Sequence, residues 1–199
     1  MSHLVLSKDK IYFKKNSKNI YLGPWEMSDI TKSYFYEYDL IIPEWHWDDL
    51  DKLYEDSKII NKIYKELILK LGEVLNDIHG FSWSTREWQI LVGPWFKRFI
   101  SIIYERYETI KKIYDSYDLK SCSTSNYSIN DLQFKDFNDF SLISNENQFQ
   151  QIVYSYILKK LDKKKKIIFN EIKISKKKIF VKKKKKNLNF KKNIKNFFF

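Results

Sequence analysis

The sequence predicts an α/β fold in which long helices pack on a parallel, layered sheet. Short apolar and β-branched runs fill the region before Pro43, and apolar residues follow helical spacing from Asp49 onward. Strands followed by helices in this order favour parallel pairing. The 199 residues, 43% of them hydrophobic, allow one domain or slightly more. With 14 Tyr, 15 Phe and 6 Trp against 4 Gly, the core is expected to consist of large side chains.

Three strands are expected near the N terminus. Residues 2–6 (SHLVL) and 19–23 (NIYLG) are short apolar runs typical of buried strands. Residues 34–42 (YFYEYDLII) are rich in β-forming residues, alternate in polarity, and stop at Pro43. They predict a half-exposed strand.

A long helix is expected from Asp49 to His79, because apolar residues recur there at helical spacing. Asp48 or Asp49 is placed to cap its first turn, and Gly80 supplies a left-handed C-terminal stop. His79 needs no special role, since a cation complements the end of a helix.

A second helix is predicted to begin after Ser84. Ser84 and Glu87 have capping-box spacing, in which each satisfies a free backbone N–H group of the other, and Trp83 and Trp88 occupy the hydrophobic staple positions. Pro94 interrupts the apolar run that follows, so we expect a bent or broken helix whose second segment begins there.

The remaining residues before the tail are less regular. Residues 119–142 are rich in Ser, Asn and Asp, and favour a strand followed by a long loop. Residues 145–161 (NENQFQQIVYSYILKKL) predict a third helix.

Lysine dominates after residue 160. Residues 159–199 contain 18 Lys against two acids, a net charge of +16, and the whole chain carries +12, so residues 1–158 carry −4. The high pI therefore does not indicate a DNA-binding face on the folded part, and nucleic acid is not an expected partner of it. We expect residues 1–160 to form the domain and residues 161–199 to form a low-complexity tail outside the fold.

Two interpretations of the tail are open. One is a basic arm that binds nucleic acid or makes peripheral contact with an anionic membrane surface. The other is a shifted reading frame, because A- and T-rich codons encode Lys, Phe, Asn and Ile. We favour the second, because Phe and Ile scattered among lysines suit neither a solvated arm nor an amphipathic helix.

Several classes of protein lose support from what the sequence lacks. Cys122 is the sole cysteine, which excludes an internal disulfide and fits a reducing compartment. No apolar run has the length of a signal peptide core or a membrane helix, so a cytoplasmic location is expected. The GxGxxG, Walker A and GxSxG motifs are absent, and the three His and one Cys lack metal-ligand spacing, so no metal or dinucleotide cofactor is expected.

The tetrad Leu22-Gly23-Pro24-Trp25 follows the second expected strand, at the edge where α/β folds bind ligands. Gly23 would let a ligand approach the backbone closely, and Trp25 would lie beside it. The alternative is a buried turn with Trp25 in the core, which is favoured on these residues alone.

The block Glu44-Trp45-His46-Trp47-Asp48-Asp49 lies between a strand end and a helix start. His46 is a candidate general base or phosphate ligand, and Asp48 and Asp49 are candidates to orient it or to bind a sugar hydroxyl. Alternatively, the aspartates cap the helix and the two tryptophans pack. We favour capping for the aspartates and leave His46 open.

Arg86 lies in the first turn of the second helix, where free N–H groups and the helix dipole favour anions. A guanidinium there could bind a phosphate or carboxylate in bidentate fashion. The favoured alternative is a surface arginine paired with a nearby acid.

Taken together, these motifs resemble a family of bacterial transferases encoded in O-antigen and other surface-polysaccharide loci. The resemblance runs from about residue 19 to about residue 160. It rests on Leu22–Trp25, Pro43–Asp49 with Lys52–Tyr54, Leu75–Gly80, and Ser84–Trp95.

The resemblance implies a Rossmann-like N-terminal half of a two-domain, glycosyltransferase-B-type enzyme, longer than this chain. Such enzymes take a nucleotide-sugar donor mainly in the C-terminal domain, and contact a glycan or lipid-linked acceptor in the N-terminal one. From their places in the sequence, we take His46 as the catalytic candidate, and Gly23, Trp25, Asp48, Asp49, Arg86 and Trp88 as candidates for substrate binding. We therefore expect a truncated transferase, inactive by itself. The alternatives are a small non-enzymatic protein that binds through its basic arm, and a folded remnant without function.

Overall fold

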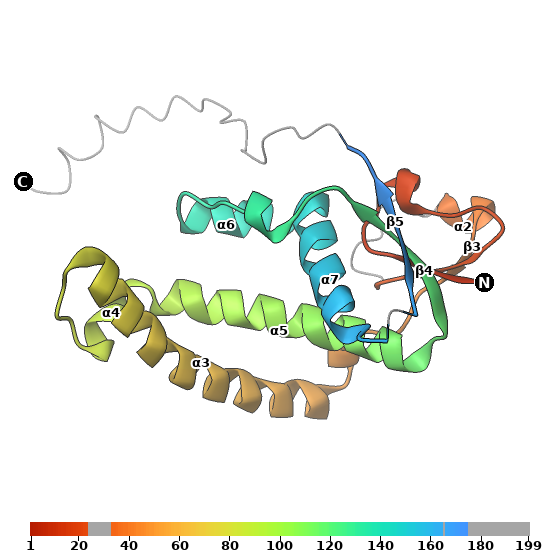
Figure 1. The fold of residues 1–199 in the computed structure, drawn as a ribbon. Coiled ribbons are helices and arrows are strands. Elements are labelled where there is room, and N and C mark those ends of the chain that lie inside the picture. Colours follow the sequence, from red (N-terminus) through yellow and green to blue (C-terminus); the bar gives the residue numbers. More distant parts are fainter. Residues whose placement is uncertain (24–32, 165, 175–199) are drawn as a thin grey trace, which may run out of the picture.

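The computed structural model of the chain describes residues 1–23, 33–164 and 166–174. These residues form a five-stranded, wholly parallel sheet with strand order β3-β2-β1-β4-β5 (Figure 1). The strands are β1 (Ser2–Val5), β2 (Lys18–Tyr21), β3 (Asp39–Ile41), β4 (Leu119–Ser125) and β5 (Ile168–Ile172). The strand order reverses between β1 and β4, as in Rossmann-like sheets. The predicted α/β fold with a parallel sheet is confirmed.

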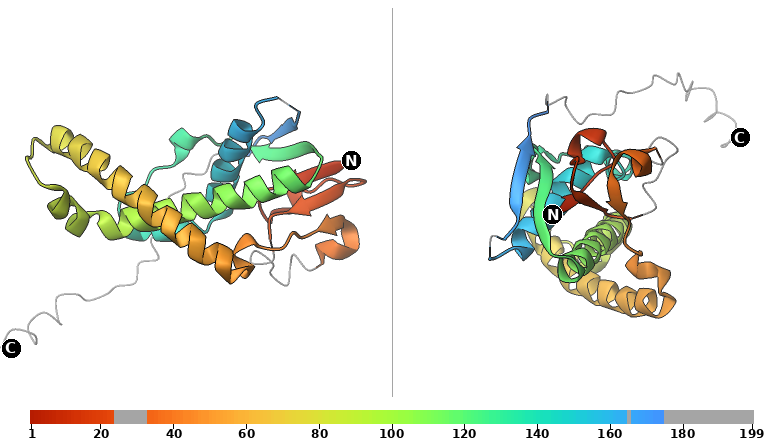
Figure 2. Two further views of the ribbon diagram at one scale, coloured as in Figure 1. Left: turned by 90° about the horizontal axis from the view of Figure 1, so that it is seen from below. Right: turned by 90° about the vertical axis from the view of Figure 1, so that its right-hand side faces the viewer.

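Helices make up most of the rest of the described chain. The longer ones are α3 (Leu50–His79), α4 (Thr85–Leu91), α5 (Gly93–Ser116), α6 (Phe137–Ile143) and α7 (Asn147–Leu161). Short ones are α2 (Tyr34–Glu37), η1 (Lys10–Tyr12), η3 (His46–Asp48) and η4 (Ile129–Asp131). In Figures 1 and 2, α3 runs outward from the sheet and α5 runs back, so that α4 lies at the far end of a helical arm. No described helix has the length and apolarity that crossing a bilayer requires.

The main core lies between the sheet and the pair α5 and α7. Its buried members include Leu4 in β1 and Leu6 just after it, Ile110 and Ile113 of α5, and Leu158 of α7. A smaller cluster on the opposite face contains Val5, Tyr12 and Tyr21. Successive residues around β1 thus alternate between the two faces, as the period of a strand requires.

The predicted helix ends are confirmed. Asp49 caps α3, because its Oδ1 accepts from the backbone N–H groups of Asp51 at 3.0 Å and Lys52 at 3.1 Å. Gly80 ends α3 in the left-handed region, with φ of 65°. Ser84 and Glu87 form the capping box of α4, and the break before α5 places Pro94 in its first turn.

Two predictions about elements were partly wrong. Residues 34–42 are not one strand, because Tyr34–Glu37 forms α2 and only Asp39–Ile41 is extended. The physical reason is where β2 begins, because its first residue, Lys18, pairs with Asp39, and residues before Asp39 have no partner in β2. The expected long loop in 119–142 contains the start of α6, whose first turn is capped by the Asp136 carboxylate.

The predicted domain boundary near residue 160 differs from the observed fold. β5 lies beyond it and pairs with β4 through the register Ser121↔Ile168 to Ser125↔Ile172. Asp162 holds the backbone that leads into β5, because its carboxylate accepts from the backbone N–H groups of Lys166 at 3.0 Å and Ile167 at 2.9 Å. A lysine-rich composition therefore concealed a strand. Residues 175–199 lie outside the described chain, so the interpretations of the tail stay predictions for them.

At the tip of the arm, one amide holds the turn between α3 and α4. Asn76 donates to the Trp83 carbonyl at 2.9 Å and accepts from the Trp83 N–H at 3.1 Å and the Trp88 indole N–H at 2.9 Å. The staple prediction is confirmed, since the rings of Trp83 and Trp88 lie 4.7 Å apart.

Replacing Asn76 with alanine is expected to lower the free energy of unfolding by about 2 kcal/mol, because it strands the N–H of the buried Trp88. Urea denaturation would measure the change. Asp77→Ala, at the exposed neighbouring position, is the matched control and should change stability little. Equal effects of both substitutions would contradict the role of the amide.

Candidate functional site

The candidate site is built around His46, which follows the carboxyl end of β3 and lies in η3. The side chain is buried, with 6% of the residue exposed. Its ring packs against two tryptophans, with ring centroids 6.0 Å from Trp45 and 5.1 Å from Trp47, and the two indoles lie 5.6 Å from each other. Each tryptophan is anchored to a different helix, because Trp45 Nε1 donates to Glu105 on α5 at 3.1 Å and Trp47 Nε1 donates to Asp56 on α3 at 3.0 Å. The histidine is thus held at the base of the arm.

Glu105 is the centre of a buried polar network on the α5 side. Its Oε1 accepts from Trp45 and from the Thr109 hydroxyl at 2.9 Å, and its Oε2 accepts from Arg106 Nη1 at 2.8 Å. Arg106 also donates from Nη2 to the Ser144 carbonyl at 3.2 Å. Both Glu105 and Arg106 are 8% exposed, so they form a buried ion pair. The network ends at His46, whose Nδ1 lies 3.4 Å from Thr109 Oγ1.

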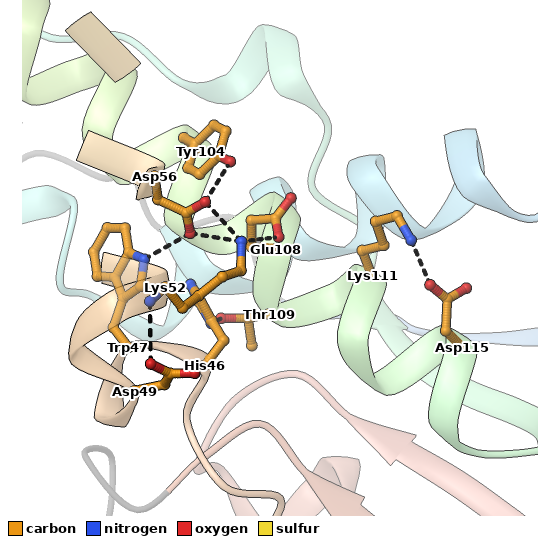
Figure 3. A network of polar contacts seen from close by, with 10 residues as sticks. All are labelled: His46, Trp47, Asp49, Lys52, Asp56, Tyr104, Glu108, Thr109, Lys111 and Asp115. Carbon is orange, nitrogen blue, oxygen red and sulfur yellow. Dashed lines mark hydrogen bonds and ion pairs between the residues drawn. The ribbon is translucent and has the colours of Figure 1, made fainter. Parts of the chain in front are cut away.

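A second network lies on the α3 side and is drawn in Figure 3. The Asp56 carboxylate is 1% exposed and accepts from Trp47, from Lys52 Nζ at 2.6 and 2.8 Å, and from the Tyr104 hydroxyl at 2.9 Å. Lys52 also reaches Glu108 on α5 at 2.9 Å. These contacts join η3, α3 and α5, so that the base of the arm is fixed around the histidine.

The two networks give the ionisable groups different states. Burial lowers the pKa of His46, against the opposing influence of the nearby Glu105 carboxylate, so its imidazole is neutral at pH 7. Burial alone would raise the pKa of Asp56, but hydrogen bonds from Lys52, Trp47 and Tyr104 outweigh it and lower that pKa. The site therefore presents a neutral base beside a fixed carboxylate.

Three buried polar side-chain atoms have no hydrogen-bond partner within the described residues: His46 Nε2, Arg106 Nε and Gln150 Oε1. Buried polar atoms are nearly always paired, so each of these invites explanation. His46 Nε2 is the only one of the three that belongs to a group titrating near neutral pH. An unpaired imidazole nitrogen can accept a proton from a hydroxyl group brought within hydrogen-bond distance.

The usual ligand crevice of such a sheet, between the carboxyl ends of β1 and β4, is bridged by a side chain. Gln151 of α7 donates to Ser7 Oγ at 3.0 Å and accepts from the Ser125 N–H at 3.3 Å. Both ends of this amide are therefore used. The bridge leaves the region after β2 and β3, where Gly23 and His46 lie, as the candidate ligand edge.

Comparison with known proteins assigns the chain to a family. The sequence model of a family described as LIC12162 family transferase matches residues 2–199. The chain belongs to this family. No curated protein and no solved structure matches it. Membership in the LIC12162 family of transferases supports group transfer as the reaction class of the protein.

The structure separates the residues that the sequence predicted as one acceptor site of this LIC12162 family transferase. His46 precedes α3 and Arg86 follows it, and the 30 residues of α3 span about 45 Å. Arg86 is exposed on α4, and Trp88 is buried there against Asn76, at the far end of the arm (Figure 1). Arg86 and Trp88 are therefore not brought together with His46, and their role in substrate binding stays a prediction.

The other predicted residues lie nearer to His46. Gly23 is buried directly after β2, at the carboxyl edge of the sheet. Asp48 is exposed in η3. The favoured capping role is confirmed for Asp49. Trp25 lies outside the described residues, and binding of substrate by Gly23, Asp48 and Asp49 stays a prediction.

The sequence interpretation missed Glu105, Arg106, Thr109 and Asp56. A signal for three of them was present, because Arg106 and Thr109 continue the buried stripe of α5 that also contains Ile113, with Glu105 beside it. Polar residues at core positions of an amphipathic helix call for buried partners. The partners, however, are Trp45 and His46 at η3 and Ser144 at the end of α6, which only the fold brings close.

Proposed function

We propose that the site around His46 activates the acceptor hydroxyl in a glycosyltransferase of surface-polysaccharide assembly, such as that of O-antigen. One observation carries the proposal: a buried, neutral imidazole whose Nε2 has no partner in the described chain. A general base of this kind must be unprotonated at neutral pH and must point a lone pair at the proton it removes.

In the proposed reaction, Nε2 takes the proton of an acceptor hydroxyl as its oxygen bonds to the anomeric carbon of the donor sugar. The bond from that carbon to the leaving phosphate breaks, and its electron pair departs with the nucleoside diphosphate. The imidazolium then returns its proton to water. Because Nε2 is covered by protein atoms, the surrounding side chains must move aside when an acceptor binds.

The glycosyltransferase-B assignment is part of the same proposal. It is supported by the motif resemblance, by membership in a transferase family, and by a parallel sheet of the order found in Rossmann-like domains. In such an enzyme, a second domain would hold the nucleotide-sugar donor, and the described domain would contact a glycan or lipid-linked acceptor.

Replacing His46 with glutamine is expected to lower the rate of glycosyl transfer about 100-fold, because the amide cannot take a proton. The assay would follow transfer from a panel of labelled nucleotide sugars to oligosaccharide and lipid-linked acceptors. It would use the longest natural form of the protein that the gene encodes. His79→Gln, which changes an exposed histidine at the tip of the arm, is the matched control and should retain full activity. Undiminished transfer by the His46 variant would remove the proposal.

A non-enzymatic alternative is supported by the net charge of +16 over residues 159–199. Such a protein would bind RNA or anionic vesicles in a salt-dependent manner. The structure sharpens the test, since β5 must be kept: the deletion should begin at residue 175. Binding that persists without residues 175–199, or that is never seen, would exclude the basic arm.

A further inference from the structure

We infer that Glu105 and Thr109 position His46 in the tautomer that carries its proton on Nδ1 and keeps Nε2 as a free lone pair. This use of the two residues rests on the proposed function of His46. They act as positioning residues, since neither would touch the substrate.

The Glu105 carboxylate can only accept hydrogen bonds. Its carboxylate is ion-paired with Arg106 at 2.8 Å, and the pair is buried. An ionised carboxylate has no proton to donate, so every hydrogen bond that it makes must be accepted. Glu105 Oε1 therefore accepts from the Thr109 hydroxyl at 2.9 Å, as it does from the Trp45 indole.

The single hydrogen of the Thr109 hydroxyl decides which ring nitrogen of His46 carries a proton. The Thr109 hydroxyl has one hydrogen, and that hydrogen points at Glu105. The 3.4 Å contact of Thr109 Oγ1 with His46 Nδ1 must then be one in which the ring donates and the hydroxyl accepts. Two lone pairs would otherwise face each other. In a neutral imidazole, a proton on Nδ1 leaves Nε2 without one.

Helix α5 fixes the positions of Glu105 and Thr109 relative to each other. Glu105 and Thr109 are four residues apart on α5, so they lie on one face of the helix and keep a fixed relation to each other. The indole of Trp45 spans from η3 to the same carboxylate oxygen, which ties the position of the ring to the group that sets its proton. Figure 3 shows His46 beside Thr109 at this junction. The charges of Lys52, Asp56 and Glu108 also act on the ring, but within the described chain none of them forms a hydrogen bond with either ring nitrogen.

Imidazole nitrogen-15 NMR of the intact chain tests this directly and needs no substrate. At pH 7, Nε2 of His46 should resonate as an unprotonated, pyridine-type nitrogen, and Nδ1 as a protonated, pyrrole-type nitrogen. In Thr109→Val, which keeps the shape and removes the hydroxyl, both shifts should move toward the average of the two tautomers. Thr109→Ser should restore the original pattern. His79, exposed at the tip of the arm, serves as the internal reference for a ring outside this network.

The opposite tautomer in the unmodified protein, or an unchanged pattern in Thr109→Val, would overturn the inference. A transfer assay on the same variants separates the two proposals. Thr109→Val should lower kcat about tenfold with little change in KM, and Thr109→Ser should recover most of it, because only the share of the active tautomer changes. If the tautomer shifts as stated but transfer does not, the positioning role stands and His46 is not the base.

Discussion

Replacing Arg106 with methionine is expected to lower the free energy of unfolding by about 3–5 kcal/mol, the range seen when one partner of a buried ion pair is removed. The guanidinium is 10% exposed at the side-chain level and is the only charge paired with Glu105 in the described chain. Methionine keeps much of the volume against Phe149 and Tyr154, whose rings lie 5.7 Å from the guanidinium carbon. The loss would therefore reflect an uncompensated carboxylate, and urea denaturation followed by circular dichroism would measure it.

Two further variants separate charge from packing. The double variant Glu105→Gln with Arg106→Met removes both charges, so it should be more stable than Arg106→Met alone. Arg98→Met, on the exposed part of the same helix, should cost less than 1 kcal/mol. If the double variant were less stable than Glu105→Gln alone and also less stable than Arg106→Met alone, the buried pair would not govern stability at this site.

The parts of the fold that sequence could predict are those set by local chemistry. The cap of α3 at Asp49, its stop at Gly80 and the capping box at Ser84 are each decided within a few residues, and all three are confirmed. By contrast, the split between α2 and β3 depends on where β2 begins, because its first residue, Lys18, pairs with Asp39. Local β propensity could not reveal that limit.

β5 shows the same limit more strongly. Residues 166–174 were assigned to the lysine-rich tail, although they contain only two Lys and are mostly apolar, and an edge strand needs only a few apolar side chains on one face and a partner for its backbone. Asp162 supplies the turn, and β4 supplies the partner. Composition averaged over the tail therefore hid a strand whose signal was five residues long.

In the candidate site, too, local sequence could suggest some residues, and others could be assigned only from the fold. His46 could be proposed from its position between a strand end and a helix cap. Glu105 and Thr109 could not be assigned to it, because they are about 60 residues away in the chain. Arg86 fitted a local rule for anion binding at helix starts, but the arm carries it far from His46. Local rules identified groups capable of chemistry, and only the fold decided which of them meet.

Replacing Asp56 is the second substitution that is expected to change the free energy of unfolding strongly. Asp56→Asn should lower the free energy of unfolding at pH 7 by about 3 kcal/mol, because an amide cannot accept from Lys52, Trp47 and Tyr104 as a carboxylate does. The pKa of Asp56 is lowered in the folded protein, so its contribution is fully present above the unfolded value of about 3.9 and is lost as the pH falls through the folded value. The difference between the variant and the unmodified protein should therefore be constant from pH 7 to pH 5 and shrink below pH 4.

Urea denaturation at pH 7, 5 and 3.5 would follow this dependence. The matched control is Glu55→Gln, at the preceding position of α3, where the side chain is 64% exposed and pairs with Lys58. An exposed pair of this kind contributes at most about 1 kcal/mol, with little change over the same pH range. If Asp56→Asn behaved like this control, the base of the arm would be held by apolar packing. His46 would then owe its placement to the Glu105 network alone.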